Sequence, residues 1–585
     1  MQVNKKSLKP ILGTFFDIPN YQRLYSWNED NWYDLYESFL NNYESNNYYF
    51  LGSLIIKTQN QPNIVDVIDG QQRLTTICIL LKSISDIFSE DSDSFSVNSI
   101  KKILKEEIEE GQFKYRIAHN KVDKKNFEFI IDSSYEQIEI KYPKEQIQPN
   151  MVRAYNFFYN ILQGKEYNSK KNIYQKNADI KIFSSNDLKQ LYKFILDYCQ
   201  LIEIALDDKD SEQEIFNTMN STGLKLSTGD LLKNYFFQNQ TLEEKYLKKW
   251  QSIFEEEDTN FSGDEKINFW SEILSSNRGN TNLDLIMYSA LLIEETKGEN
   301  FTTFQQQTTY KDLFNVYKKI LKTEKDKENI LNNIFELSQA YLILFNLDKN
   351  KIDYNKKLNL LLFIIQKSGY NVFYPLILFL YNDSKINNKD KAYIEISKLL
   401  VFNSIFSKET NYLSKLVSSL LKIVQTDGLK EMIEEINKVF SAKISHNIND
   451  LVQDIANINF YGSSKKSKII LFLSLIEGYI RGKNTEQLFE YNSDLQSIEH
   501  IIPQKYQQSY NIKDENNIYT IGNLTLLSKP NNSKASNKHF EDKKDIYKNS
   551  PLQIVSNLAN QDDVNEAFII KRSKEFAEIL LDIFK

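Results

Sequence analysis

Short apolar runs alternate with longer helical patterns over the first 240 residues. The runs at 50–56, 63–69 and 201–206 are rich in β-branched residues and bounded by turn-forming residues, so each predicts a strand. After Gly70 the apolar residues recur at helical spacing, which predicts a sharp turn at Gly70 and a helix beyond it. This pattern predicts a mixed α/β domain.

Residues 241–450 show a different pattern, because nearly every stretch is typical of an amphipathic helix. Residues 328–345 and 413–424 are examples. We expect a helical connector without a fixed-period repeat and without a chemical motif. Residues 451–585 return to short strands, loops and a Lys-rich helix, which predicts a third domain. The whole pattern therefore predicts an α+β, helix-rich, multidomain protein.

The composition is that of an ordinary globular protein, and it limits both the kind of fold and the way in which a polyanion could bind. The 585 residues suit two to four domains, and only 16 Gly and 9 Pro among them favour long helices over many tight turns. The 72 basic and 79 acidic side chains give a net charge of −7, so a polyanion would have to bind a local patch. Residues 461–550 offer a mild one, with 13 Lys and Arg against 10 Asp and Glu.

Cysteine usage and hydropathy indicate the compartment. Cys78 and Cys199 lie in apolar runs and are expected to be buried free thiols, too few for a disulfide framework or a four-cysteine zinc site. The N-terminus lacks the apolar stretch of a signal peptide, and the longest apolar runs fall well short of the ~20 residues that span a bilayer. We therefore expect a cytoplasmic protein without a membrane partner.

An aromatic and basic segment, IPNYQRLYSW, occupies residues 18–27. Its Arg and Gln side chains can fork onto phosphates or base edges, and its aromatic rings can stack on bases. Tyr21, Gln22 and Arg23 are the candidate contacts to a nucleotide or nucleic acid. The competing interpretation is that Trp27 and the tyrosines fill a core beside the first helix.

A second candidate site, DGQQR, lies where the strand ending at Asp69 turns into the next helix. Gly70 permits the turn, and a helix N-terminus offers free N–H groups to an anion. Asp69 can hold Mg²⁺ or position a water, while Gln72 and Arg73 can contact phosphate oxygens. The alternative is a structural turn with Arg73 paired to a nearby carboxylate. The chain has no G-x-x-x-x-G-K-[S/T], which excludes a Walker-type nucleotide site.

A third pattern begins at Glu499-His500 in EHIIP and continues with Asn523 in IGNLTLL, then Asn531 and Asn532. The order predicts strand, loop, strand and helix, which would gather these side chains around one hard cation. A His near neutral pKa can take a proton from water, the cation stabilises the developing charge, and lysines hold the backbone. These are the parts of phosphodiester cleavage. Without the asparagines, a His beside a Glu is more often a hydrogen-bonding residue of the surface or core.

The three remaining histidines carry little functional signal. His119 and His446 stand alone in polar surroundings, so we expect both to be solvated. His539 lies on the predicted Lys-rich helix and can reach phosphate.

Four blocks together resemble the N-terminal domain of GmrSD-type modification-dependent restriction enzymes. They are IPxYQRxYxW, FxGS, DGQQRLTT and IFNTMNSTGLKLSTGDLLKN (215–234). The resemblance implies a fold similar to ParB and sulfiredoxin, which couples nucleotide binding or hydrolysis to sensing of modified DNA. It implies Asp69, Gln72 and Arg73 as catalytic residues of the nucleotide chemistry. The implied nucleotide-binding or DNA-sensing residues are Tyr21, Gln22, Arg23, Gly70 and Gln71. The partly structural second block contains Asn220, Gly223 and Asp230.

EHIIP, GNLTLL and NNSKASN resemble an HNH (ββα-metal) nuclease of the class fused to such sensors. The resemblance implies His500 as general base and Glu499 and Asn532 as ligands of Mg²⁺ or Mn²⁺. The pattern departs from zinc-bound members in lacking CxxC pairs, and Glu stands before His where many members have Asp. The residues implied to support the centre are Asn523, Asn531, Asn537 and Lys538.

Together the two resemblances imply a single-chain anti-phage DNA endonuclease. Residues 1–240 would sense DNA modification with an NTP, either GTP or ATP, residues 241–450 would connect, and residues 451–585 would cut or nick. The expected partners are double-stranded DNA, modified or from phage, and a nucleotide; a homodimer is left open.

Two alternatives stay open at this point. In the first, the chain is similar to phosphorothioate-sensing Ssp-type nucleases. It would then be an NTPase and nicking enzyme that phosphorothioate stimulates and that protects modified host DNA. In the second, it is a nucleotide-gated DNA-binding protein whose nuclease domain is inactive. The first alternative and the anti-phage interpretation use the same YQR and DGQQR blocks, so the sequence does not separate those two. Against the second alternative, His500 and the asparagines are all present.

Overall fold

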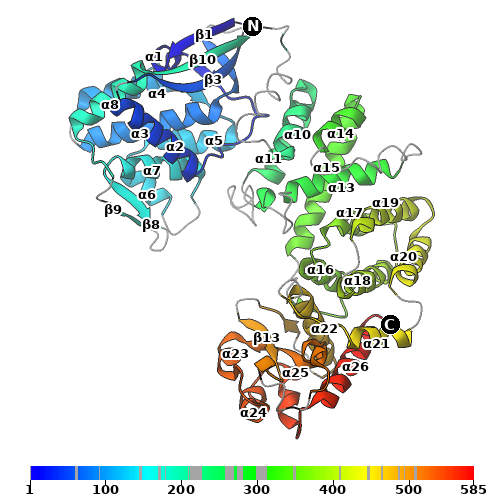
Figure 1. Ribbon diagram of the computed structural model, residues 1–585. Coiled ribbons are helices and arrows are strands. Elements are labelled where there is room, and N and C mark those ends of the chain that lie inside the picture. Colours follow the sequence, from blue (N-terminus) through cyan, green and yellow to red (C-terminus); the bar gives the residue numbers. More distant parts are fainter. Residues whose placement is uncertain are drawn as a thin grey trace. The chain divides into compact units, whose positions relative to one another are not determined.

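The computed structural model forms two compact units, Met1–Glu272 and Ile273–Lys585 (Figure 1). It describes residues 2–45, 47–59, 63–90, 93–143, 148–168, 173–177, 180–207, 210, 227–256, 269–272, 281–297, 313–346, 351–406, 410–444, 448–462, 466–484, 488–492, 495–505, 510 and 512–585. Helices dominate and a mixed sheet lies in the first unit, which confirms an α+β, helix-rich, multidomain protein. The domain boundaries at 240 and 450 stay predictions.

A six-stranded sheet organises the first unit, in the order β1-β10-β3-β4-β2-β7. β10 runs parallel to β3, whereas β1 and β4 run antiparallel to their neighbours β10 and β3. The predicted strands at 50–56, 63–69 and 201–206 are confirmed as β3, β4 and β10. The strands of the sheet are β1 (Gln2–Ser7), β2 (Phe15–Asp17), β3 (Tyr49–Thr58), β4 (Ile64–Asp69), β7 (Ile117–Ala118) and β10 (Cys199–Leu206).

Helix α3 is the central helix of the first unit, and apolar side chains along most of its length are buried. It packs against α4 and α7 (Figure 1). A smaller cluster joins Ile55, Ile68 and Leu206 of the sheet to Leu231 of α10.

The first unit contains helices α1 (Leu8–Ile11), α2 (Glu29–Glu44), α3 (Gln71–Glu90), α4 (Ser94–Leu104), α5 (Lys121–Asp132), α6 (Tyr135–Lys141), α7 (Asn150–Ile161), α8 (Ser185–Asp197), α10 (Thr228–Phe237) and α11 (Gln240–Phe254). It also contains two hairpins, β5 (Lys105–Glu109) with β6 (Gln112–Tyr115) and β8 (Lys165–Asn168) with β9 (Ile173–Lys176).

The second unit begins with a helical region, as predicted, and ends with a small hairpin surrounded by helices (Figure 1). α22 packs against α16 of the helical region and against α26. The elements are α13 (Asn282–Glu295), α14 (Leu313–Ile320), α15 (Glu324–Asn346), β11 (Lys351–Ile352), α16 (Lys357–Ser368), α17 (Tyr374–Asn382), α18 (Lys389–Ile405), α19 (Asn411–Thr426), α20 (Leu429–Lys443), α21 (Ile448–Ala456), α22 (Lys466–Asn484), β12 (Phe489–Glu490), β13 (Gln496–His500), β14 (Leu524–Ser528), α23 (Lys529–Ala535), α24 (Phe540–Lys548), α25 (Gln553–Ser556) and α26 (Glu566–Ile583).

Cys78 and Cys199 are buried free thiols, as predicted. The expectation that His119 is solvated is wrong. Its ring packs on Phe127 with centroids 4.7 Å apart, and burial lowers the pKa of its imidazole to about 3. His446 lies outside the described residues. Within the described ranges, every helix is too short or too polar to cross a membrane.

Candidate functional site

The DGQQR turn forms as predicted, because β4 ends at Asp69 and α3 begins at Gln71. Gly70 has a φ of +99°, a conformation that favours glycine. A Cβ at Gly70 would lie 3.0 Å from Leu54 Cδ1 and 3.3 Å from the carbonyl oxygen of Ser53. The turn therefore requires a glycine both for its backbone and for its packing against β3.

Arg73 lies over the irregular part of β3. Its Nη1 donates a hydrogen bond to the carbonyl oxygen of Ser53, 3.1 Å away. Gly52 has a φ of +93°, and a Cβ there would lie 3.3 Å from Arg73 Nη2. Burial raises the pKa of the Asp69 carboxyl, and the Arg73 and Arg23 guanidinium groups oppose that rise. Asp69, Arg73 and Arg23 thus interact electrostatically at the turn.

Gln22 fastens the aromatic and basic segment to the end of β4. Its Nε2 donates to the carbonyl oxygens of Val67 and Ile68, at 2.7 and 2.9 Å, and the residue is 2% exposed. The carbonyl oxygen of Gln22 lies 3.4 Å from Lys233 Nζ of α10, which also forms a buried ion pair of 2.5 Å with Glu255. Gln22 is therefore a structural link in this conformation.

The two glutamines of DGQQR fasten the same segment to α3. Gln71 Nε2 donates to the carbonyl oxygen of Arg23 at 3.0 Å. Gln72 Nε2 donates to the carbonyl oxygen of Leu24 at 3.1 Å, and Gln72 Oε1 accepts from the backbone N–H of Ser26 at 2.8 Å. The two motifs are thus brought together, but the amide groups predicted to meet phosphate are bonded to the protein.

Some aromatic residues of the segment fill the core, and another stays at the surface, as contact with a nucleotide or nucleic acid requires. Tyr25 is a core residue: its hydroxyl contacts Thr76 Oγ1 at 2.6 Å and accepts from Trp32 Nε1 at 2.9 Å. Trp27 packs against the same core. Tyr21 and Arg23 are only half-buried, so both remain at the surface of the turn.

The second block of the resemblance is only partly described. Asn220 and Gly223 lie outside the described residues. Asp230 and Ser227 form the capping box at the start of α10. The structural role expected for part of this block therefore holds at Asp230.

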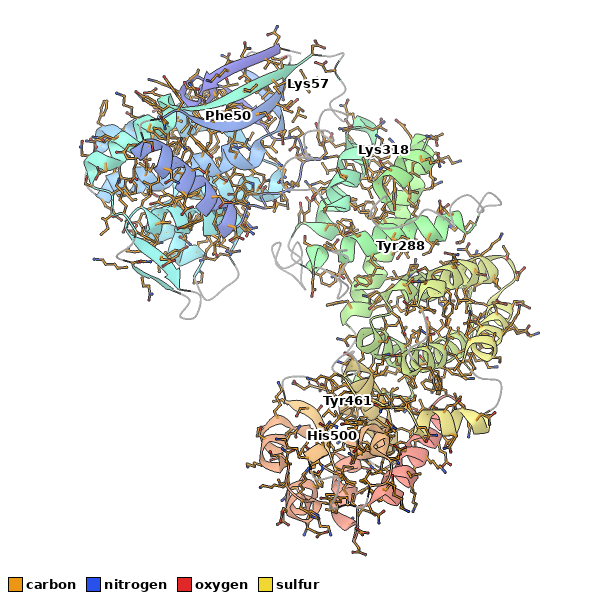
Figure 2. The ribbon with its side chains drawn as sticks, in the orientation of Figure 1. Phe50, Lys57, Tyr288, Lys318, Tyr461 and His500 are labelled. Atoms are coloured by element: carbon orange, nitrogen blue, oxygen red, sulfur yellow. The ribbon has the colours of Figure 1, made fainter. Side chains whose placement is uncertain are left out.

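The C-terminal motif folds as strand, loop, strand and helix, in the predicted order. β13 and β14 pair antiparallel, with Glu499 opposite Thr525 and His500 opposite Leu524, and α23 follows β14 directly. Figure 2 marks His500 among these elements. Asn523 immediately precedes β14 and is completely buried.

Asn523 holds the loop that follows His500, as the resemblance implies. Its Oδ1 accepts from the backbone N–H of Ile502 at 2.8 Å, and its Nδ2 donates to the carbonyl oxygens of Ile502 and Ile518 at 3.0 and 2.9 Å. The carbonyl oxygen of Asn523 also accepts from the backbone N–H of Ile501 at 2.9 Å. This network fixes the end of β13, where His500 lies.

Asn532 rather than Asn531 reaches β13. Asn532 Nδ2 donates to Ser497 Oγ and to the carbonyl oxygen of Ile498, at 2.7 and 2.8 Å. The backbone N–H of Asn531 donates to Ser528 Oγ, which caps α23. The Lys-rich helix, which the sequence predicts to open at Asn537 and Lys538, begins only at Phe540 as α24, and Ser536 with its positive φ ends α23 before it. Asn537, Lys538 and His539 are exposed between α23 and α24.

Glu499 is paired with a lysine of α24. Its Oε1 accepts from Lys543 Nζ at 2.7 Å and from the Tyr547 hydroxyl at 3.1 Å. The role of a phosphate contact expected for the lysines of this helix is therefore wrong for Lys543, whose side chain is 0% exposed. Burial raises the pKa of the Glu499 carboxyl, and the Lys543 ammonium opposes that rise.

His500 is half-buried at the end of β13, and the amide Nε2 of Gln504 lies 3.3 Å from its Nε2. Burial and the nearby Lys543 ammonium lower the pKa of the His500 imidazole to about 4. The ring is therefore neutral at physiological pH, which is the state that accepts a proton.

Glu499, one of the two predicted cation ligands, does not fit a divalent cation as it lies here, because the Lys543 ammonium already pairs with its carboxylate. The Glu499 carboxylate faces Lys543, and the Asn532 amide N–H groups donate to β13. Across the residues that the structure describes, no three His, Cys, Asp or Glu side chains gather as a metal site would require.

Sequence reasoning missed Arg572 and Gly522. Arg572 Nη1 donates to the carbonyl oxygens of Gly522 and Leu524, at 2.7 and 3.0 Å. A Cβ at Gly522 would lie 2.1 Å from the carbonyl oxygen of Ile569 in α26. One signal existed: Arg572 occupies the apolar stripe of α26 that also holds Ile569 and Phe576.

Two family models match the chain. The GmrSD restriction endonuclease N-terminal domain matches residues 3–237, and the GmrSD restriction endonuclease C-terminal domain matches residues 446–579. A search of curated proteins finds no match. The first match contains the DGQQR turn and the second contains His500 and its supporting residues.

Proposed function

Because the chain belongs to the GmrSD family of restriction endonucleases, we propose that it cuts or nicks DNA at the centre around His500. The observation that carries the proposal is the fixed, neutral His500 at the end of β13, held by the buried Asn523. A neutral imidazole at a fixed strand end can accept a proton, which is the first requirement of a general base. The substrate is double-stranded DNA, modified or from phage.

In the proposed reaction, the His500 imidazole takes a proton from a water molecule. The resulting hydroxide attacks the phosphorus atom, and one phosphorus–oxygen ester bond of the DNA backbone breaks. The leaving sugar oxygen keeps the electron pair of that bond and takes a proton from solvent water. Asn523 keeps the strand end in place, so the backbone that carries His500 does not have to be ordered when the DNA arrives. The requirement for Mg²⁺ or Mn²⁺ stays a prediction, since the Glu499 carboxylate is already paired with the Lys543 ammonium.

The first unit is the proposed sensor, and the DGQQR turn is its proposed nucleotide site. The hydrogen bond to Ser53 uses one of the five N–H donors of Arg73, so the guanidinium group retains donors for phosphate oxygens of GTP or ATP. Asp69 would position the attacking water for nucleotide hydrolysis. Gln22, Gln71 and Gln72 would connect nucleotide occupancy to the aromatic and basic segment, because their hydrogen bonds join the two motifs.

Cleavage and nucleotide turnover test this proposal together. Plasmid DNA that is unmodified, phosphorothioate-modified or glucosylated at hydroxymethylcytosine would be incubated with the full chain, Mg²⁺, and GTP or ATP. Cutting of one of these DNAs, with nucleotide turnover stimulated by the same DNA, supports a modification-dependent nuclease and identifies what it senses. Phosphorothioate stimulation would select the host-protecting alternative. Turnover and DNA binding without any cutting would select the nucleotide-gated binding protein with an inactive nuclease domain.

A further inference from the structure

Lys543 of α24 contacts three consecutive residues at the end of β13. Its Nζ donates to Glu499 Oε1 at 2.7 Å and to the carbonyl oxygens of His500 and Ile501 at 2.8 and 3.4 Å. An ammonium group has three N–H donors, so these acceptors use all of them. Because the side chain is also 0% exposed, Lys543 has neither the surface nor the donors for a DNA phosphate.

Glu499 is also buried, and its Oε1 is engaged within the protein. Its residue is 4% exposed, and Oε1 also accepts from the Tyr547 hydroxyl at 3.1 Å. A divalent cation bound by this carboxylate would lie close to the Lys543 ammonium, and like charges in a poorly solvated site repel strongly. The Lys543 ammonium already supplies the positive charge that a buried carboxylate needs.

We propose that Lys543 is the cation that neutralises Glu499, and that this ion pair positions His500 instead of binding a divalent metal. The proposal rests on the proposed function of His500 as the base. The ion pair fixes the strand from the α24 side through the Glu499 carboxylate and the His500 and Ile501 carbonyl groups. Asn523 fixes the following residue, Ile502, through its backbone. Lys543 is therefore a positioning residue that acts through β13.

Direct metal binding tests the first half of this proposal without relying on cleavage. Mn²⁺ would be titrated into the full chain and followed by electron paramagnetic resonance, in an Asp69→Asn background that removes the other carboxylate proposed to lie near phosphate. Glu499→Gln should leave the Mn²⁺ affinity unchanged. A loss of affinity of about 10-fold or more in Glu499→Gln, as expected for a removed ligand, would overturn the proposal.

Cleavage kinetics test the second half, with Lys543→Met compared with Lys544→Met. Lys543→Met should lower kcat by about 10-fold or more with an unchanged KM for DNA, because only the position of His500 is lost. Lys544 is the matched control, since it is the next residue of α24 and its side chain is 26% exposed. A raised KM with unchanged kcat in Lys543→Met would show a phosphate contact and would overturn the proposal.

A double variant that removes both charges of the ion pair distinguishes a loss of folding from a loss of His500 positioning. Glu499→Gln with Lys543→Met buries no unpaired charge, so its Tm should exceed that of either single variant. Its kcat should stay low, because the donors to His500 and Ile501 are still missing. Recovery of both Tm and kcat would mean that the ion pair is only structural. His500→Ala is measured alongside: if it cuts normally, the proposed function fails, whereas the Mn²⁺ result still decides the role of Glu499.

Discussion

Asn523 and Ile502 form a reciprocal pair of hydrogen bonds, in which the Asn523 side chain accepts from the Ile502 N–H and donates to its carbonyl oxygen. The side chain thereby imitates a neighbouring strand and fixes the backbone at Ile502, two residues after His500, the last residue of β13. Asn523→Ala would leave these buried groups without partners and should destabilise the second unit by about 3 kcal/mol. Chemical denaturation measures this cost. Asn537→Ala is the control, because Asn537 is exposed between α23 and α24, and the stability of this variant should equal that of the parent.

Gly522 should not accept even the smallest side chain. An alanine Cβ would lie 2.1 Å from the Ile569 carbonyl oxygen and 2.4 Å from Ser573 Oγ, so α26 would have to move away from β14. We expect Gly522→Ala to cost about 3 kcal/mol or more in the free energy of unfolding. Gly482→Ala in α22 has open space around its Cβ and should be neutral or slightly stabilising. Equal stabilities for the two variants would contradict the close approach of α26.

Arg73→Ala should abolish nucleotide turnover while leaving the first unit folded. The guanidinium group makes one described hydrogen bond, to Ser53, whereas phosphate contact is its proposed purpose. Turnover of GTP and ATP by the full chain measures the effect, with thermal unfolding as the check on folding. Arg153→Ala is a suitable control, since Arg153 pairs with Glu29 at the surface. Unchanged turnover in Arg73→Ala would remove the DGQQR turn from the nucleotide site.

His119 should make the first unit sensitive to acid. Its pKa is about 3 in the folded chain and about 6.5 when unfolded, so the unfolded state binds the proton first. Its effect on stability is therefore absent above about pH 6.5, and stability falls progressively as the pH decreases toward about 3. His119→Gln should flatten this dependence in denaturation experiments at pH 7 and pH 5. A parallel loss of stability in both proteins between these pH values would contradict the assignment.

The local features that the sequence predicts well have local causes. The turn at Gly70 follows from a buried apolar strand, a glycine and a helical pattern in succession, and its position is confirmed. β1 was missed because QVNKKS is mostly polar, as is common for an edge strand, and its pairing with β10 depends on residues about 200 positions away. The sequence of β1 alone therefore does not reveal that it pairs with β10.

The candidate sites show the same limit. Lys543 lies in a run of charged residues that is typical of an exposed helix, yet its partner Glu499 is 44 positions earlier in the chain. Only the packing of α24 beside β13 reveals the ion pair. Gln71 and Gln72 lie beside the aromatic and basic segment, and their hydrogen bonds to Arg23, Leu24 and Ser26 could be assigned only in three dimensions.

If His500 is the base for DNA cleavage, its replacement should stop cutting and leave binding intact. Cleavage of the DNA that the parent chain cuts would be measured for His500→Ala and for His539→Ala, an exposed histidine of the same unit. DNA binding and Tm would be recorded for both. The account predicts that His500→Ala binds DNA and stays folded but cuts at least about 100-fold more slowly, while His539→Ala cuts like the parent. Cleavage by His500→Ala at the parent rate would contradict it.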